Sequence, residues 1–403
     1  MTEKRNSGFL FALSLYIPGF FINLGYGIVS PILPLYAQSF NIPYVLVAMI
    51  ITSNAIGRLC SDIPLGVICD RVGRRPLSIL GPLLATISAI LSGLAQNFYE
   101  LLAYRLVMGV GMSMWMIAAM ARIADNASPS MRGKITSTYQ AANMIGTTAG
   151  PAVGGFIAQL SNSYRAPFFF YAASTLASMV TALILVRESA PSQRQYSKLS
   201  IQANFRKFLK FLNFPILMAT FMILTNHIRF SAWNTLLPLY GGDVLNLNSG
   251  EIGLIMSTLT LTQFLILTPA GYVIDKYGRK IALIPSFIIA AVSFVILPFS
   301  KDFFSATLVA AFLGVASGLG GATWALATDL SPEESRGSFM GFWHTFGDIG
   351  TSTGPIILGF IADSYGFSPA FYVVAGLMFV TAATTQFFVK ETLDEQSIHH
   401  SII

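Results

Sequence analysis

Long hydrophobic runs follow one another along almost the whole chain of 403 residues, and short polar stretches separate them. A helix needs about 20 apolar residues to cross a bilayer, because all its backbone hydrogen bonds must be made within the helix. Twelve runs come close to this length or exceed it, namely 9–37, 44–67, 77–95, 101–124, 135–160, 166–186, 214–240, 251–274, 281–299, 304–328, 337–362 and 368–389. The pattern predicts an all-α membrane protein with 12 transmembrane helices.

The composition supports this interpretation, since 54% of the residues are hydrophobic, 10% are charged and the mean hydropathy is +0.65. The first run follows Lys4 and Arg5, but it is too long for a secretory signal, and no small-residue cleavage site follows it. We therefore expect it to remain as the first helix. Cys60 and Cys69 fall on one span, so a structural disulfide is not expected.

Lysine and arginine gather in alternate connections between the runs. With a cytoplasmic N-terminus, 19 of the 24 such residues lie on the cytoplasmic side, whereas only Arg165 and Lys301 lie in connections on the other face. Cytoplasmic loops of membrane proteins carry an excess of these residues. We predict that both termini are cytoplasmic. The net charge of +6 then reflects orientation in the membrane and indicates no nucleic-acid partner.

Several short segments occur twice, about half a chain apart. "GVICDRVGRR" at 66–75 matches "GYVIDKYGRK" at 271–280 with an offset of 205 residues. "SPILPLY" matches "NTLLPLY", "MRGK" matches "SRGS", and "GTTAGP" matches "GTSTGP", each with an offset of 204. Such a repeat predicts two parallel six-helix bundles, over 1–186 and 214–403, joined by a cytoplasmic linker over 187–213.

The linker has the pattern of an amphipathic helix. Its apolar residues recur at helical spacing against a basic face, and they are Ile201, Phe205, Phe208, Leu209 and Leu212. We interpret it as a helix lying on the inner leaflet. The alternative is a solvated basic linker with some helix.

The doubled segment resembles the loop signature of the major facilitator superfamily, Gly-x-Leu-Ala-Asp-Arg-x-Gly-Arg-Arg/Lys, between helices 2 and 3. Ile68 and Cys69 replace its Leu and Ala. The matching residues are Gly66, Asp70, Arg71, Gly73, Arg74 and Arg75, with a degenerate copy at Asp275, Gly278 and Arg279. The resemblance covers essentially the whole chain. It implies two pseudo-symmetric bundles that act as a secondary transporter.

The charges of these segments are expected to pair at the cytoplasmic ends of helices. Asp125 at the end of helix 4 would pair with Arg74, and Asp329 at the end of helix 10 would pair with Arg279. The glycines would let helix ends approach closely. The resemblance implies latches that hold the outward-facing state and break as the bundles rock. The alternative, that the charges only fix topology, does not account for the aspartates within the segments.

Two further runs resemble motifs of the same family. The fourth run contains Arg-x-x-x-Gly-x-Gly at Arg105, Gly109 and Gly111. The fifth run matches Gly-x-x-x-Gly-Pro-x-x-Gly-Gly in full, through Gly146, Gly150, Pro151, Gly154 and Gly155. A looser copy in the eleventh run has Gly350, Gly354, Pro355 and Gly359. Small residues four apart let helices pack backbone to backbone. In this family the full motif is associated with drug–proton exchange, so it favours antiport over uptake.

Six ionisable residues fall inside the predicted spans, where an unpaired charge is costly: Arg58, Asp62, Arg105, Arg229, His344 and Asp348. On antiparallel helices 2 and 11, Arg58 lies at the same depth as Asp348. Asp62 matches His344 in the same way. We interpret these residues, with Arg105, as a gating network that couples protonation to opening. The alternative is one ion pair within each helix.

Arg105 and Arg229 fall in the outer half of helices that line the central cavity of this family. The resemblance therefore implies a cavity for a neutral or anionic, partly aromatic solute. Its other candidate residues are Asn226, His227, Trp233, Asn234, Trp115, Trp324 and Trp343. The alternative for each tryptophan is a lipid-facing or core position. The first run carries no acidic residue, which argues against a cationic drug.

The chain lacks the P-loop, zinc-protease and serine-hydrolase motifs, so we expect a transporter driven by an ion gradient and not an enzyme. The leading interpretation is proton-coupled efflux of a lipophilic, neutral or anionic molecule, with Asp348 on the proton path. The alternative is uptake of a small organic anion by symport or facilitation. A sensor or membrane-embedded enzyme is not favoured. We expect a monomer in the cell membrane, with a small-molecule substrate, protons and lipid as partners and no cofactor or metal.

Overall fold

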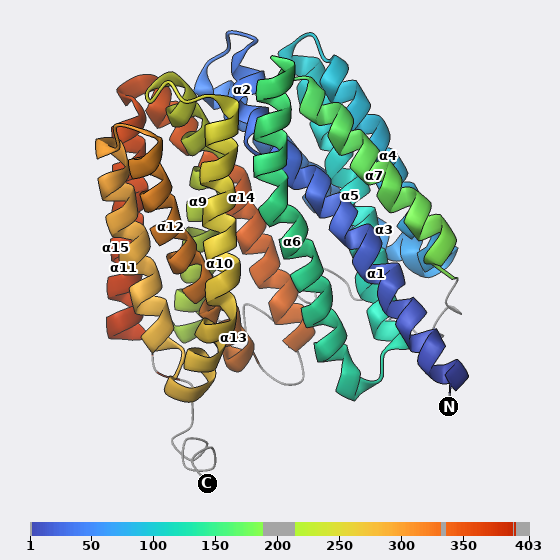
Figure 1. Cartoon of the computed structure of the whole chain (residues 1–403). Helices are drawn as coiled ribbons and strands as arrows, with labels where there is room; N and C mark the ends of the chain where they lie inside the picture. The colour runs from blue at the N-terminus through green and yellow to red at the C-terminus, as the bar shows by residue number, and fades with distance from the viewer. Residues whose placement is uncertain (1, 188–213, 332–335, 390, 392–403) are drawn as a thin grey trace. The chain divides into compact units, whose positions relative to one another are not determined.

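The computed structural model describes residues 2–187, 214–331, 336–389 and 391. Within these residues the regular elements are α-helices and one 3-10 turn at Leu297–Phe299, with no strand (Figure 1). The all-α class predicted from the sequence is thereby confirmed. The amphipathic helix expected in the linker lies outside the described residues.

The first six hydrophobic runs fold into seven helices. They are α1 (Thr2–Val29), α2 (Ile32–Gln38), α3 (Tyr44–Val72), α4 (Arg74–Leu94), α5 (Phe98–Asn126), α6 (Pro129–Ser161) and α7 (Ala166–Leu185). The first run divides at Pro31, which precedes α2 and has no N–H to continue the α1 hydrogen-bond ladder. Most of the other helix ends lie beyond the ends of the apolar runs, whereas α4 and α7 each end one residue before theirs.

The last six runs fold in the same way. They are α9 (Phe214–Asp243), α10 (Ser249–Tyr277), α11 (Lys280–Ile296), α12 (Phe303–Leu319), α13 (Ala322–Leu330), α14 (Arg336–Tyr365) and α15 (Phe367–Phe388). The tenth run divides at Gly320 and Gly321, between α12 and α13. Asp302 caps α12 by accepting a hydrogen bond of 2.8 Å from the backbone N–H of Ser305, and this bond lowers the pKa of the carboxyl.

Nine helical stretches in the described part of the chain are long and apolar enough to cross a membrane. The helices that miss this threshold are α6, α9 and α14, although they contain 33, 30 and 30 residues. Each is interrupted by polar side chains, as in "TNHIRFSAWN" of α9 and "HTFGDIGTSTGP" of α14. The count of 12 spans therefore remains a prediction for these three helices.

Contacts divide the chain into two compact units. The first unit comprises Met1–Gln193 with Pro238–Ser257, and the second comprises Arg194–Leu237 with Thr258–Ile403. Both α9 and α10 thus contribute residues to both units. The division into bundles at 1–186 and 214–403 remains a prediction.

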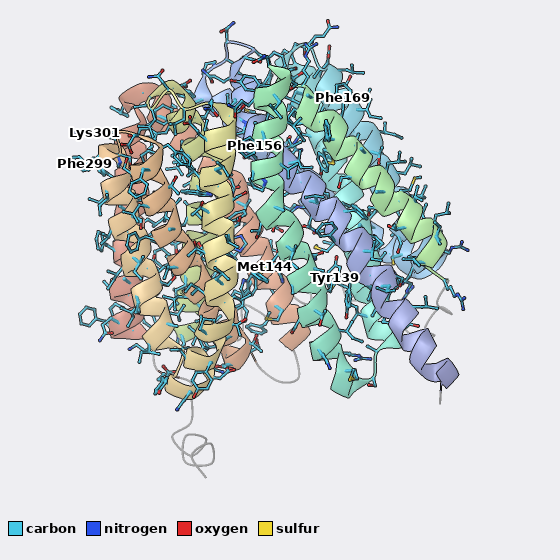
Figure 2. All side chains as sticks on the ribbon, viewed as in Figure 1. Tyr139, Met144, Phe156, Phe169, Phe299 and Lys301 are labelled. Atoms are coloured by element: carbon cyan, nitrogen blue, oxygen red, sulfur yellow. The ribbon has the colours of Figure 1, made fainter. Side chains whose placement is uncertain are left out.

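Large apolar side chains cover much of the outer surface of the helices. Phe156 on α6 and Phe169 on α7 are 44% and 42% exposed, and Figure 2 shows them on the outside of their helices. Buried residues of the first unit form a core that includes Tyr139 of α6. Helices whose outer faces contact lipid show this arrangement, because hydrocarbon favours apolar side chains.

Candidate functional site

Arg74 joins three helices at one end of the first unit. Its Nε lies 2.9 Å from Asp125 Oδ2 of α5, and its Nη2 lies 3.1 Å from Asp70 Oδ1 of α3. Nη1 also donates to the carbonyl of Cys69 at 2.9 Å. Gly73 has φ of 103°, a value that favours glycine, and it turns the chain from α3 directly into α4. The arginine is buried among acceptors on both neighbouring helices.

Arg279 has the corresponding arrangement in the second unit. Its Nε lies 2.9 Å from Asp329 Oδ2 of α13, and Gly278 has φ of 104°. Asp275 lies farther away, at 3.7 Å, and its side chain is 81% exposed. Asp125 and Asp329 are the partners expected from the sequence. Their role as latches remains a prediction.

A carboxylate missed by the sequence analysis completes the second arrangement. Glu391 accepts hydrogen bonds from the backbone N–H groups of Arg279 at 2.9 Å and Lys280 at 3.0 Å. It thereby caps the N-terminus of α11, where negative charge is stabilising. The signal was available, because "VKE" at 389–391 repeats "VRE" at 186–188. Glu188 lies outside the described residues.

Gly66 does not have the role expected of it. A Cβ at this position would have no described atom within 4 Å, so Gly66 allows no close helix contact here. Arg71 and Arg75 extend from exposed positions. Within the signature, Asp70 and Arg74 form the ion pair and Gly73 makes the turn described above.

The glycines of the fifth-run motif bring α6 against α1. A Cβ at Gly150 would lie 2.5 Å from Gly27 Cα, and one at Gly146 would lie 2.7 Å from the carbonyl oxygen of Phe20. At Gly154 it would overlap the carbonyl of Ile28. These positions require glycine because the two backbones touch.

Gly155 faces the part of α10 that belongs to the first unit. Close by, the Ser257 hydroxyl donates to the carbonyl of Thr148 at 2.8 Å and accepts from the N–H of Ala152 at 2.9 Å. The hydroxyl thus bridges two backbone groups that an unbroken α-helix would join directly. This inserted hydroxyl lies beside Pro151, which has no N–H to donate to the backbone hydrogen-bond ladder of α6.

The looser copy in the eleventh run packs α14 against α9. A Cβ at Gly350 would lie 2.6 Å from the carbonyl oxygen of Leu224, and one at Gly354 would lie 2.6 Å from Ser231 Oγ. Pro355 lies inside α14. The structure therefore gives Gly350 and Gly354 a packing role like that of the glycines in α6.

Asp62, His344 and His227 have partners within their own units. Asp62 accepts a hydrogen bond from the Ser113 hydroxyl of α5. The ring of His344 lies 4.5 Å from that of Trp324, centroid to centroid. His227 Nδ1 lies 3.0 Å from Thr351 Oγ1. The pairs proposed between helices 2 and 11 join different units and remain predictions.

Three of the expected cavity tryptophans pack in the cores. Trp343 is fully buried and donates to Thr220 Oγ1 at 3.1 Å. Trp115 is 2% exposed and donates to Tyr139 Oη at 3.0 Å, while Trp233 is 4% exposed. Because so little of each side chain is accessible in this structure, these three fit the core alternative, and their place at a solute cavity remains a prediction. Trp324 remains partly exposed.

Two arginines are buried without a carboxylate partner among the described residues. Arg229 is 5% exposed, and its Nη2 donates to Asn226 Oδ1 at 2.6 Å. Arg105 is 3% exposed and makes no hydrogen bond or ion pair with a described residue. Asn234 uses its amide to donate to the carbonyl of Phe230 at 2.9 Å.

The sequence analysis did not single out a third buried arginine. Arg122 lies inside α5 and is 2% exposed. Its Nη1 donates to the carbonyl of Ser14 at 3.2 Å, and its Nη2 donates to the Ser14 hydroxyl. Ser14 lies four residues before Pro18, which has no N–H for that carbonyl. A proline four residues after Ser14 was the sequence signal that the Ser14 carbonyl needs another donor.

Comparison with known proteins places this fold in a family. The model of the Major Facilitator Superfamily matches residues 15–250 and 242–400. Multidrug resistance protein 2 of Bacillus subtilis (strain 168) is 28% identical over 350 residues, covering 84% of this chain and 86% of that protein. Quinolone resistance protein NorA of Staphylococcus aureus (strain COL) is 25% identical over 366 residues, covering 89% and 92%.

Solved structures show the same fold at low sequence identity. A bacterial homologue of the human lysosomal transporter Spinster, inward-facing and unoccupied, has a TM-score of 0.78 at 15% identity and covers 94% of this chain and 95% of its own. The nucleoside transporter NupG also has a TM-score of 0.78 at 15% identity, covering 94% and 100%. The chain therefore belongs to the major facilitator superfamily and is a multi-pass integral membrane transporter.

Proposed function

We propose that this transporter exports a lipophilic, neutral or anionic small molecule in exchange for protons. The observation that carries the proposal is its similarity, along 84% and 89% of the chain, to proteins named for multidrug and quinolone resistance. The glycine–proline motif of α6 adds support, because it matches the pattern associated with exchangers. Its glycines pack α6 directly on α1.

In this mechanism the solute enters from the cytoplasm or the inner leaflet, and the two bundles rock to release it outside. The ion pairs of Arg74 and Arg279 hold one closed end and break during the movement. Asp348 takes up a proton from outside and releases it inside. Protonation removes its charge, so an interaction that depends on that charge is lost and the next state becomes accessible.

The test uses purified protein in liposomes with an acidic lumen. Lipophilic aromatic drugs and organic anions are added outside, and proton release is recorded with a pH-sensitive dye. We expect drug-dependent proton efflux in the wild type and its loss in Asp348→Asn. Asp363→Asn, on the exposed end of the same helix, is the matched control and should behave like the wild type. Solute movement without proton movement would contradict the proposal.

The second candidate function is uptake of a small organic anion by symport or facilitated transport. The buried and unpaired Arg105 favours it, because an anion would supply the missing counter-charge. The same liposomes separate the candidates. Antiport requires opposite movement of solute and protons, whereas symport moves both in one direction and facilitation moves the solute alone.

A further inference from the structure

The end of α9 and the first turns of α10 pack on the first unit, although they follow the linker in sequence. Contacts assign Pro238–Ser257 to the first unit, whereas the repeat predicts a second half that begins at residue 214. Tyr44 Oη of α3 also donates to Asp243 Oδ2 at the end of α9, at 2.7 Å. The sequence assigns these helix ends to the outer face. These contacts therefore join the two halves of the repeat at their outer ends.

Small residues bring α10 against the backbone of α6. A Cβ at Gly253 would overlap the carbonyl oxygen of Pro151, and one at Gly155 would overlap that of Ser249. The Ser249 hydroxyl donates to the carbonyl of Gly155 at 3.2 Å. Residues four apart share one face of a helix, so Ser249, Gly253 and Ser257 form one contact surface of α10.

Ser257 places its hydroxyl in the backbone of α6. The hydroxyl donates to the carbonyl of Thr148 at 2.8 Å and accepts from the N–H of Ala152 at 2.9 Å. In a regular α-helix this N–H bonds to this carbonyl, because the two residues are four apart. The two groups thus have two possible arrangements, bridged by Ser257 or bonded to each other. Both arrangements satisfy the backbone, which is essential inside a bilayer.

The Ser257 hydroxyl also has an alternative acceptor in its own helix. A serine inside an α-helix can donate to the carbonyl four residues earlier, as Ser61 does to Gly57 at 2.7 Å. The carbonyl of Gly253 has the corresponding position relative to Ser257. Separation of α10 from α6 therefore leaves an acceptor for the hydroxyl as well. The bridge can form and break without exposing an unsatisfied group to hydrocarbon.

We propose that Ser257 is a positioning residue of the transport cycle that stabilises the state with closed outer ends. Its hydroxyl bridges Thr148 and Ala152 in that state and leaves when the outer ends separate, so that Ala152 then bonds directly to Thr148. Pro151 supports this role, because it has no N–H and a helix bends readily where its ladder is interrupted. This inference rests on the proposed transport by two rocking bundles and adds a residue that sets the balance between their states.

The test measures the separation of the outer ends in purified full-length protein in lipid nanodiscs. Spin labels are attached at Gln96→Cys and Lys301→Cys, which are exposed positions, in a background with Cys60→Ser and Cys69→Ser. Pulsed electron spin resonance gives the ratio of short to long label distances, the closed-to-open ratio. We expect Ser257→Ala to lower this ratio about three- to tenfold, because two hydrogen bonds of the closed state are lost. An unchanged ratio, or a wild type without a closed population, would overturn the proposal.

Three further variants separate the hydroxyl from packing. Ser257→Thr keeps the hydroxyl and Ser257→Val has the same shape without it, so the closed-to-open ratio should be higher with threonine than with valine. Equal ratios in these two variants would show that the hydroxyl is not responsible and would reject the bridge. Ser53→Ala is the matched control, because the Ser53 hydroxyl donates to the carbonyl of Ile50 in its own helix at 2.7 Å. It should leave the ratio unchanged, and a fall equal to that of Ser257→Ala would count against a specific role.

The role of Ser257 and the antiport function are tested separately. The label distances are recorded without drug and without a proton gradient, so they do not depend on the transported solute. A lower ratio in Ser257→Ala, with no drug-dependent proton efflux in wild-type liposomes, would contradict the antiport function alone. Drug-dependent proton efflux in the wild type, with an unchanged ratio in Ser257→Ala, would contradict the role of Ser257 alone.

Discussion

At the scale of single residues, buried arginines in this protein serve different purposes. Arg122 compensates for a proline, since it donates to the Ser14 carbonyl that Pro18 leaves without its helical donor. Nearby, the Ser178 hydroxyl donates to the carbonyl of Pro18 at 2.9 Å. In the low dielectric of a helix bundle such bonds matter, because an unsatisfied backbone carbonyl is costly. Arg105 has no comparable structural bond.

This assignment predicts coupling between Arg122 and Pro18. Arg122→Leu should lower the free energy of unfolding in mixed micelles by about 1–3 kcal/mol, because the Ser14 carbonyl loses its donor. Pro18→Ala restores a backbone N–H that bonds to this carbonyl. The double variant should therefore lose less stability than the two single changes predict together. Strict additivity would show that Arg122 does not compensate for the proline.

At the scale of elements, the turns from α3 into α4 and from α10 into α11 differ in the ion pairs that surround them. In the first unit the Asp70 side chain is 36% exposed and lies 3.1 Å from Arg74. In the second unit Asp275 is 81% exposed and lies 3.7 Å from Arg279, while Glu391 caps α11. Both copies of the repeat therefore keep the arginine and its carboxylate partner, which lies on the fourth run in the first copy and on the tenth run in the second. The aspartate four residues before the arginine is closer to it and less exposed in the first unit.

We expect the stability effects to follow the exposure of the carboxylate, which is 15% for the Asp125 side chain and 81% for that of Asp275. Asp125→Asn should cost about 1.5–3 kcal/mol, because a hydrogen bond to a buried charged group is weakened. Asp275→Asn should cost only about 0–1 kcal/mol, as an exposed pair contributes little. Thermal or chemical unfolding of the purified variants in detergent measures both. An equal loss in the two variants would show that exposure does not decide the strength of these ion pairs.

At the scale of the whole molecule, apolar surface and the placement of positive charge define its relation to the bilayer. Exposed phenylalanines cover the outer helix faces, and Phe299 is 67% exposed beside Lys301 (Figure 2). Lys301 is one of the two basic residues in connections assigned to the outer face. Gly133 lies in the first turns of α6, within the basic segment that the sequence assigns to the cytoplasmic side.

Cysteine labelling of intact cells checks this orientation. In a background with Cys60→Ser and Cys69→Ser, Lys301→Cys should react with a membrane-impermeant maleimide added outside. Gly133→Cys should react only after the membrane is permeabilised. Both positions are exposed, and a Cβ at Gly133 has no described atom within 4 Å, so neither change creates a clash. Labelling of Gly133→Cys from outside would reverse the assigned topology.

The sequence by itself determined the helical class, the positions of the helices, the repeat and the pairing of Arg74 with Asp125. Helix positions can be predicted segment by segment, because the free energy of inserting a helix into the bilayer depends on that helix's own residues. The pairing can be predicted because the repeat shows which helix ends correspond. The sequence did not determine that Trp115 and Trp343 are core residues or that Glu391 caps α11. Those contacts depend on how far each helix is rotated about its axis and which neighbour it meets. Only the tertiary structure decides that rotation, because it results from packing many side chains at once and no single segment specifies it.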